Sequence, residues 1–379
     1  MQVGVVKETH PGEMRVGLVP ESVSRLKSAG VDVLLEKDAG DAAGFPDAAY
    51  EKAGATIAPD AKAVLSQADL LVKVRAPTYG NGGEVQGMKA GAGVIALLQP
   101  LTSPELLRAL AKQGLDSFSM ELVPRITRAQ SMDALSSQAT AAGYKAVLLA
   151  ASESPKFFPM LMTAAGTIPP SKVLVLGAGV AGLQAIATAR RLGAVVEGYD
   201  VRPDVKEQVE SLGARWVGLA MEEAVGAGGY AKEVSEEAQK RALEHLHKLV
   251  IASDVVITTA QIPGRKAPVL VTEDMVKGMQ PGSVIVDLAA DSGGNCALSE
   301  AGKTVIRYGV HIMGPAELAS TMPYHASQMY SRNIVALLNN MLKDGALNLD
   351  LEDEVTKGCL VTHGGEVVHE RAKATLSAS

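Results

Sequence analysis

Cysteine, aromatic residues and positive charge are all scarce in this 379-residue chain, and each scarcity excludes a class of protein. The two cysteines, Cys296 and Cys359, lie far apart without the paired spacing of a zinc site or a disulfide framework, which fits a reducing compartment. Aromatic residues make up 3% of the chain, so the hydrophobic cores must be aliphatic. A net charge of −6 without a basic run argues against nucleic acid as the main partner.

Long apolar runs are missing as well. The longest run, from Val173 to Leu183, is well short of the roughly 18 residues that a membrane-spanning helix needs. The amino terminus is charged within its first seven residues and has no signal-peptide core. These features predict a soluble protein and leave docking on a membrane partner open. The length of the chain allows two domains, each with its own core.

Residues 171–202 carry the most informative pattern. A short valine-rich run bounded by glycine predicts a buried parallel strand, and a glycine turn, a helix and a second strand follow directly. Strand, glycine turn, helix, strand and acid in this order form the setting that a dinucleotide fingerprint needs. The elements are a strand at 173–176, the glycines Gly177, Gly179 and Gly182, a helix at 183–192, a strand at 195–199, and Asp200.

Each element of this pattern has a role in holding a dinucleotide. Gly177 permits the tight turn, Gly179 lets the backbone approach a pyrophosphate, and Gly182 lets the helix pack on the strand. Val180 and Ala181 lie at the start of the helix, where free N–H groups and the positive end of the dipole attract phosphates. We therefore predict a dinucleotide site; the alternative is a tight turn in another α/β fold.

The acid after the second strand indicates which dinucleotide binds. Asp200 ends that strand, where a carboxylate accepts hydrogen bonds from the adenosine ribose and repels a 2′-phosphate. Arg202, with Val201 between it and the acid, could instead attract a 2′-phosphate, contact the pyrophosphate or lie at the surface. Because the acid holds the strand-end position itself, we expect NAD(H), with all three residues near the cofactor.

Residues 1 to about 124 alternate strand and helix signals but lack the glycine pattern. The alternation predicts an α/β fold of two Rossmann-like domains with parallel sheets, joined by long helices, with the cofactor in the cleft between the domains. We expect one domain to contain residues 1–130 and 325–379, and the other residues 131–324. A helix at 325–342 and a hairpin at 359–369 would then complete the first domain.

Three further elements are expected from local sequence. Phe118 to Val123 and Thr304 to Val310 are expected to be the last strands of the two sheets. Thr167 to Pro170 is expected to be a proline-rich lead into the second domain.

A polar loop, residues 125–136, precedes a long helix expected from about Ser131 to Ala151. Ligands in open α/β folds lie beyond the carboxyl ends of strands, so Arg125, Arg128, Gln130 and Asp133 are expected to face a ligand. The alternative is a solvated loop in which Asp133 caps the helix.

Two other segments are candidates for cofactor contacts. The glycine-rich stretch 225–234, which contains Gly229 and Tyr230, suggests either a lid over the cofactor or a plain surface connection. Gln261 follows the strand expected at 255–260, where it would contact the nicotinamide half of a dinucleotide. His245 and His247 lie two apart on a helix and point to different sides, which argues against a metal site.

Taken together, these stretches resemble a known superfamily, that of alanine dehydrogenase and transhydrogenase. Segments 5–9, 11–16, 71–77 and the fingerprint carry the general resemblance. A narrower set is similar to the NAD(H)-binding domain of proton-translocating nicotinamide nucleotide transhydrogenase, and the resemblance covers nearly the whole chain. That set comprises the polar loop, 162–170, the Gly228–Lys232 segment, 257–264 and 293–296.

The resemblance implies a homodimer that binds NAD(H) and faces an NADP(H)-binding domain on another chain. It also implies attachment to the cytoplasmic face of the inner membrane through a membrane-spanning partner subunit, with hydride transfer coupled to proton translocation. Arg125, Gln130, Asp133 and Ser136 match the family's loop around the nicotinamide, and Tyr230 matches its mobile-loop tyrosine. Asp200 matches its ribose-binding acid, and Gly229 and Gln261 match positions near the cofactor. Gln261, often aliphatic in the family, and Ala289–Ser292 depart from the usual pattern.

The chemistry leaves three functions open. An alanine dehydrogenase needs a positioned acid or base; in that branch of the family a lysine and a histidine serve. Lys73 is kept here, but the histidine expected around Leu97–Gln99 is missing. Hydride exchange between two nicotinamides needs no such group, so we favour a transhydrogenase subunit. A free-standing amino-acid dehydrogenase and a non-catalytic NAD(H)-binding module remain as alternatives, and Lys73 and Arg15 are either inherited ligands or structural ions.

Overall fold

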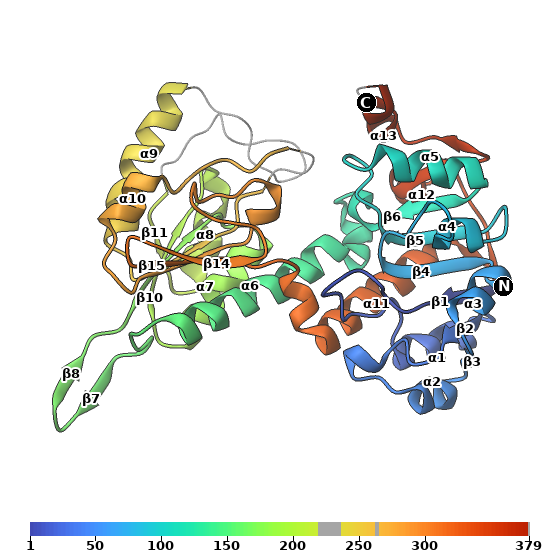
Figure 1. Cartoon of the computed structure of the whole chain (residues 1–379), viewed down its shortest axis with the longest axis horizontal. Helices are drawn as coiled ribbons and strands as arrows, with labels where there is room; N and C mark the ends of the chain where they lie inside the picture. The colour runs from blue at the N-terminus through green and yellow to red at the C-terminus, as the bar shows by residue number, and fades with distance from the viewer. Residues whose placement is uncertain (219–235, 262–264, 378–379) are drawn as a thin grey trace. The chain divides into compact units, whose positions relative to one another are not determined.

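The computed structural model describes residues 1–218, 236–261 and 265–377 (Figure 1). The chain divides into two units: unit 1 is Met1–Gln138 with Ala319–Ser379, and unit 2 is Ala139–Leu318. Among the described residues, none of the helices combines the length and the apolar character that crossing a membrane requires.

Unit 1 is built on an eight-stranded sheet in the order β19-β18-β6-β5-β4-β1-β2-β3. Strands β1 to β6 pair in parallel, and the hairpin β18–β19 joins β6 in the antiparallel sense, so the end of the chain completes the first sheet. The strands are β1 (Gln2–Val5), β2 (Asp32–Glu36), β3 (Thr56–Ala58), β4 (Leu70–Arg75), β5 (Gly93–Leu97), β6 (Asp116–Ser119), β18 (Leu360–His363) and β19 (Glu366–Val367).

Helices cover both faces of this sheet, and each face has its own aliphatic core. Helices α1, α2, α11 and α12 pack on one core, and α3, α4, α5 and α13 pack on the other; α1 and α2 lie opposite α5 in Figure 1. The helices are α1 (Pro20–Ser28), α2 (Asp47–Ala53), α3 (Ala61–Gln67), α4 (Glu84–Gly87), α5 (Pro104–Gln113), α11 (Pro323–Met341), α12 (Glu354–Cys359) and α13 (Glu370–Ser377). Short elements are η1 (Asp41–Ala43), η2 (Met120–Leu122), η3 (Thr127–Met132), η8 (Leu318–Thr321), β16 (Leu342–Lys343) and β17 (Ala346–Leu347).

Unit 2 has a seven-stranded sheet in the order β11-β10-β9-β12-β13-β15-β14. All neighbours are parallel except β14, which runs antiparallel to β15 at the edge. Strand order reverses at β9, so the loop after β9 lies at a topological switch point, where open α/β sheets bind ligands. The strands are β9 (Lys172–Leu176), β10 (Val195–Tyr199), β11 (Arg215–Trp216), β12 (Val255–Thr258), β13 (Val284–Asp287), β14 (Lys303–Arg307) and β15 (Val310–Gly314).

Strand β9 shows why unit 2 folds as a sheet buried on both faces. Val173 and Val175 belong to the core on one face, while Leu174 and Leu176 belong to the core on the other. A continuous apolar run is therefore satisfied only in the middle of a layered fold. The helices of this unit are α6 (Ala134–Glu153), which begins in unit 1, α7 (Val180–Arg191), α8 (Lys206–Ser211), α9 (Glu236–Ile251) and α10 (Glu273–Gly278), with η4 (Pro203–Val205) and η7 (Ala290–Ser292).

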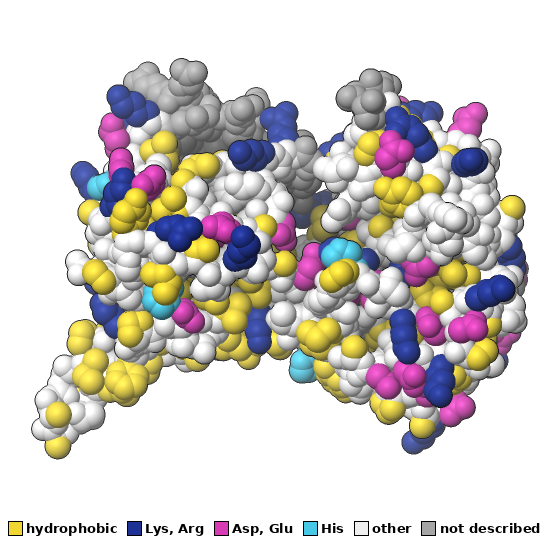
Figure 2. All heavy atoms as spheres, viewed as in Figure 1, with side chains coloured by type: hydrophobic (Ala, Val, Ile, Leu, Met, Phe, Trp, Pro, Cys, Tyr) yellow, Lys and Arg dark blue, Asp and Glu magenta, His cyan; other side chains and the backbone are white. Residues whose placement is uncertain are grey.

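A β-hairpin projects from the body of unit 2, where we had expected only a proline-rich lead (Figure 1). It consists of β7 (Leu161–Thr163) and β8 (Gly166–Ile168), with Gly166 at φ +118° in its turn. Met162 is 79% exposed, and Phe157, Met160 and Ile168 are exposed as well. Figure 2 shows hydrophobic side chains at the tip and at the base of this projection. The prediction failed because these side chains are not buried, so they give no periodic burial pattern.

Two other expected strands were wrong in their extent. The strand expected to reach Val123 stops at Ser119, because Met120 to Leu122 turn into a 3-10 helix that carries the buried Glu121. The strand expected up to Val310 is a hairpin instead, since Tyr308 and Gly309 both have positive φ and reverse the chain between β14 and β15.

Candidate dinucleotide-binding site

The glycine turn after β9 has the geometry that a bound pyrophosphate requires. A Cβ on Gly182 would lie 1.8 Å from the carbonyl oxygen of Gly177, so only glycine lets α7 pack this close to the strand end. Gly177 has φ +98°, in the left-handed region that favours glycine. A Cβ on Gly179 would meet no atom within 4 Å, so the backbone there borders open space that a ligand can occupy.

The first turn of α7 adds donors to this space. The first hydrogen bond of the helix runs from the Leu183 amide to the Gly179 carbonyl at 2.8 Å. The amides of Val180, Ala181 and Gly182 precede that bond, and Val180 is exposed although it is apolar. These three amides and the positive end of the helix dipole suit an anion.

Asp200 lies at the end of β10, as the sequence predicts, and it is buried. One of its carboxylate oxygens accepts hydrogen bonds from the backbone amide and the Nε of Arg202, both at 2.9 Å. The other accepts from the Ala178 amide and the Arg202 Nη2, both at 2.8 Å. The carboxylate therefore ties the glycine turn to the next strand. It is also neutralised by a bidentate arginine, the strong form of an ion pair, and this ion pair holds the pKa of Arg202 above its usual range.

Residues from later strands support the turn, and the sequence did not reveal them. The Thr259 hydroxyl donates to the Gly177 carbonyl at 3.0 Å. Asn295 is fully buried; its side-chain oxygen accepts from the Ala260 amide and its side-chain NH2 donates to the Ala260 carbonyl. Gln261 is exposed and donates to the Leu288 carbonyl. The signal for Asn295 was its place in the Gly293–Cys296 segment that contributed to the resemblance.

The polar loop of unit 1 divides into an exposed and a capped portion. Arg125 and Gln130 are exposed. Asp133 accepts hydrogen bonds from the Ser136 amide at 2.9 Å and from the Ser136 hydroxyl at 2.6 Å, which caps the start of α6. Helix α6 therefore begins at Ala134, after the 3-10 helix η3, and not at Ser131 as expected. Asp133 acts as a helix cap in this structure, so that interpretation of the loop is correct at this residue.

Arg128 does not project freely from the loop. Its Nη2 lies 2.5 Å from a carboxylate oxygen of Asp353, and its Nη1 donates to Asn340 at 3.2 Å. Gly229 and Tyr230, the two residues expected in a lid, lie outside the described residues.

The buried cations Lys73 and Arg15 are already ion-paired in unit 1. Lys73 lies 2.7 Å from Glu84 and 3.5 Å from Glu8, and Arg15 lies 2.6 Å from Glu13. Although burial alone would lower it, the neighbouring carboxylates raise the pKa of Lys73 above its usual value, so the ammonium stays charged. Both cations have the surroundings of structural ions.

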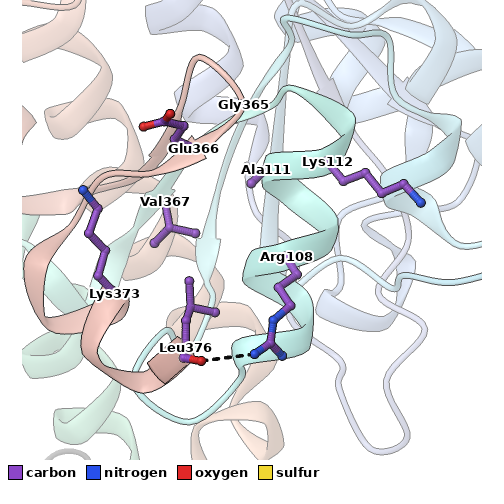
Figure 3. Close-up of a pocket in the computed structure, with 8 residues that line it drawn as sticks. All are labelled: Arg108, Ala111, Lys112, Gly365, Glu366, Val367, Lys373 and Leu376. Carbon is purple, nitrogen blue, oxygen red and sulfur yellow. Dashed lines mark hydrogen bonds between the residues drawn. The ribbon is translucent and has the colours of Figure 1, made fainter. Parts of the chain in front are cut away.

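A groove elsewhere in unit 1 is a poor candidate for binding a nucleotide. It lies between α5, the β18–β19 hairpin and α13. Arg108 donates to the Leu376 carbonyl there, and Lys112 and Lys373 extend away from each other (Figure 3). The cationic groups do not converge on one point, as binding a phosphate would require.

The fold and the glycine turn define the class: a two-unit Rossmann-like dinucleotide-binding protein. Two family models match, "Alanine dehydrogenase/PNT, N-terminal domain" over residues 4–142 and "Alanine dehydrogenase/PNT, C-terminal domain" over residues 146–370. The chain belongs to this alanine dehydrogenase/PNT family, and within it to the transhydrogenase alpha subunits.

Three relatives show how the chain sits in the family. It is 49% identical to the first of the chains that form NAD(P) transhydrogenase subunit alpha in Rhodospirillum rubrum, over 97% of this chain and 98% of that one. The crystal structure of transhydrogenase from Sinorhizobium meliloti matches with a TM-score of 0.88 at 49% identity, over 97% of this chain and 100% of that one. Alanine dehydrogenase of Bacillus subtilis is more distant, at 30% identity over 99% of this chain and 95% of that one. The resemblance inferred from the sequence is confirmed.

Proposed function

We propose that this chain is the NAD(H)-binding component of a proton-translocating transhydrogenase. In this reaction a hydride passes between NADH on this chain and NADP+ held by a partner chain. The 49% identity to a transhydrogenase alpha subunit along nearly the whole chain is the observation that carries the proposal. The open space at Gly179 and the acid at Asp200 fit a dinucleotide independently of that identity.

The cofactor supplies the chemistry, because its dihydronicotinamide carbon C4 carries the hydride. The hydride moves with its electron pair from one ring to the other, so no alkoxide forms and no proton is exchanged at the reacting carbon. The protein then has to orient two rings, not to act as an acid or base. The exposed Arg125 and Gln130, next to the capped start of α6, suit that task as donors.

We assign the binding roles as follows. The amides of Val180, Ala181 and Gly182, with the space at Gly179, hold the pyrophosphate. Asp200 binds the adenosine ribose, with Val201 and Arg202 beside it. Gln261, Gly229 and Tyr230 contact the nicotinamide half, and Tyr230 closes over it. Arg125 and Gln130 orient the ring, and the Asp133–Ser136 pair sets the loop that carries them.

We propose that the working form is a homodimer joined through the β7–β8 hairpin. A projecting strand pair with four exposed apolar side chains is costly to leave in water, and it can add to a second copy of the chain. The partners would be an NADP(H)-binding domain and a membrane-spanning subunit, and the complex would keep this chain at the cytoplasmic face of the inner membrane. Attachment through a partner is consistent with the lack of a membrane-crossing helix in the portion of the chain that the structure describes.

An NAD-dependent alanine dehydrogenase is the second candidate, since such enzymes belong to the same family. The ion pairs of Lys73 and Arg15 disfavour it, because neither cation is left to receive a substrate carboxylate. One experiment separates the two functions: the purified chain with NADH is assayed against pyruvate plus ammonia, and against NADP+ with and without the NADP(H)-binding partner. Turnover only with the partner supports the proposal, and turnover on pyruvate alone rejects it.

A further inference from the structure

The polar loop is held from behind by residues that are about 200 positions away in the sequence. These residues come from helix α11 and from the start of α12, the segment that returns to unit 1. Asn333 and Asn340 both lie on α11, and seven residues are two helical turns, so their side chains share one face. This face contacts both the 3-10 helix η3 and the first turn of α6.

Asn333 joins the two sides of the loop's capped end. It is 7% exposed, and its NH2 group donates to the Ser131 carbonyl at 2.8 Å. Its side-chain oxygen accepts from the Ser137 hydroxyl at 2.6 Å. Ser131 precedes Asp133 and Ser137 follows Ser136, so one buried amide fixes the chain on either side of the Asp133–Ser136 cap.

Asp353 fixes the other end of η3 through Arg128. One of its carboxylate oxygens receives the Arg128 guanidinium at 2.5 Å. The other accepts from the Thr356 amide at 2.8 Å, which caps α12, and from the Asn340 side chain at 2.9 Å. Since Asn340 also accepts from Arg128, these three side chains form a closed ring of hydrogen bonds beneath the loop.

We propose that Asn333 and the Arg128–Asp353 pair are positioning residues for hydride transfer. They touch neither nucleotide; they fix η3 so that Gln130, between Arg128 and Ser131, is presented in one orientation. The inference rests on the proposed function, in which Gln130 orients the nicotinamide. A displacement of about 1 Å in such a contact can slow a reaction by up to about a hundredfold while binding of the rest of the ligand persists. The expected signature is therefore a loss of rate without a loss of affinity.

The test measures deuteride transfer from C4-deuterated NADH to NADP+, with the chain assembled with its NADP(H)-binding partner. Asn333→Ala should slow transfer by about tenfold or more, while the Kd for NADH changes by less than about threefold. Arg128→Gln and Asp353→Asn should each slow it by about fivefold, and the double variant no further, because both break one ion pair. The side-chain oxygen introduced by Asp353→Asn can still cap α12, so this variant separates the clamp from the cap. Arg128→Lys, which keeps the charge, should recover some of the rate.

Two substitutions on the same segments serve as matched controls. Asn339→Ala changes an exposed asparagine of α11, and Asp350→Asn changes an exposed aspartate just before α12. Both should transfer deuteride at the wild-type rate. If Asn333→Ala fails to fold, the surface pair Arg128–Asp353 decides the question alone.

Three results overturn the inference: normal transfer in folded clamp variants, a loss of NADH affinity equal to the loss of rate, or the same loss of rate in the controls. If the wild-type complex transfers no deuteride, the proposed function fails and this inference fails with it. Normal transfer in both wild type and variants rejects only the positioning role.

Discussion

At the scale of single residues, Asp200 does more than the fingerprint assigns to it. Its two oxygens already accept four hydrogen bonds, three of them from Arg202. A carboxylate offers about four lone-pair positions, so ribose hydroxyls have to replace or share the guanidinium. Arg202 is therefore the built-in counter-ion of the acid that selects the cofactor.

Asp200→Asn should partly reverse this selection. The amide cannot accept from the ribose and the Ala178 amide as the carboxylate does, and it leaves the Arg202 cation without its ion pair. We expect NADH to bind about tenfold more weakly, the effect of losing one charge-assisted hydrogen bond. NADPH should bind more tightly, because Arg202 then faces a 2′-phosphate with no opposing carboxylate. Fluorescence titration with both nucleotides checks this, and an equal loss for both would contradict it.

Two glycines of the turn should respond to alanine in opposite ways. At Gly179 a Cβ meets no protein atom, and φ is −76°, so Gly179→Ala should fold with an unchanged melting temperature. The methyl group would occupy the phosphate space, and NADH affinity should fall by about tenfold or more. Gly182→Ala should lower the melting temperature, because its Cβ would lie 1.8 Å from the Gly177 oxygen. If Gly179→Ala binds NADH normally, the pyrophosphate does not lie there.

At the scale of elements, the cap of α12 couples the C-terminal segment to the polar loop. Although burial alone would raise it, hydrogen bonds from the Thr356 amide, Asn340 and Arg128 hold the pKa of Asp353 well below its usual range. A carboxyl with a lowered pKa stabilises the folded state above its unfolded pKa, about 3.9, and this stabilisation is lost as the pH falls toward the folded value. The clamp should therefore weaken in acid.

This sign leads to a measurable difference between variants. The free energy of unfolding should fall between about pH 4 and pH 2 in the wild type, and less steeply in Asp353→Asn, which cannot titrate at that position. Urea titrations at several pH values give both slopes. Identical slopes would mean that Asp353 has the same pKa in the folded and unfolded states.

Elements were predictable where burial is local and periodic. Strand β10 has the predicted bounds, and β9 begins one residue earlier, because valine-rich runs between glycines fit only a buried strand. Helix α7 begins three residues before the expected Leu183, directly after Gly179. The β7–β8 hairpin was missed because its side chains face water.

The support of the site was not predictable from local patterns. The sequence singled out Asp200, Gly177 and the polar loop because their motifs are contiguous. Asn333 and Asp353 lie 202 and 225 positions from the loop residues that they bind. An asparagine within a helix and an aspartate before one look the same wherever the chain goes next, so only the fold reveals their partners.

At the scale of the whole molecule, the proposed dimer makes the hairpin a test site. Met162 is 79% exposed near its tip, and replacing it with aspartate puts a charge where a second copy would bury a thioether. Met162→Asp should sediment as a monomer, or as a dimer that dissociates at about tenfold higher concentration. Ile306→Asp, at another exposed apolar position of unit 2, is the control and should stay dimeric. Equal masses for both variants and the wild type would exclude the hairpin as the dimer contact.

The central claim is that this chain passes a hydride to a nicotinamide held on another protein. The most direct measurement follows deuterium from C4-labelled NADH, with NADP+ and the NADP(H)-binding partner present, by mass spectrometry of both nucleotides. We predict that the label appears in NADPH, that it appears only when both chains are present, and that none reaches alanine when pyruvate and ammonia are added. Label in alanine without the partner, or no label in NADPH with it, would contradict the account.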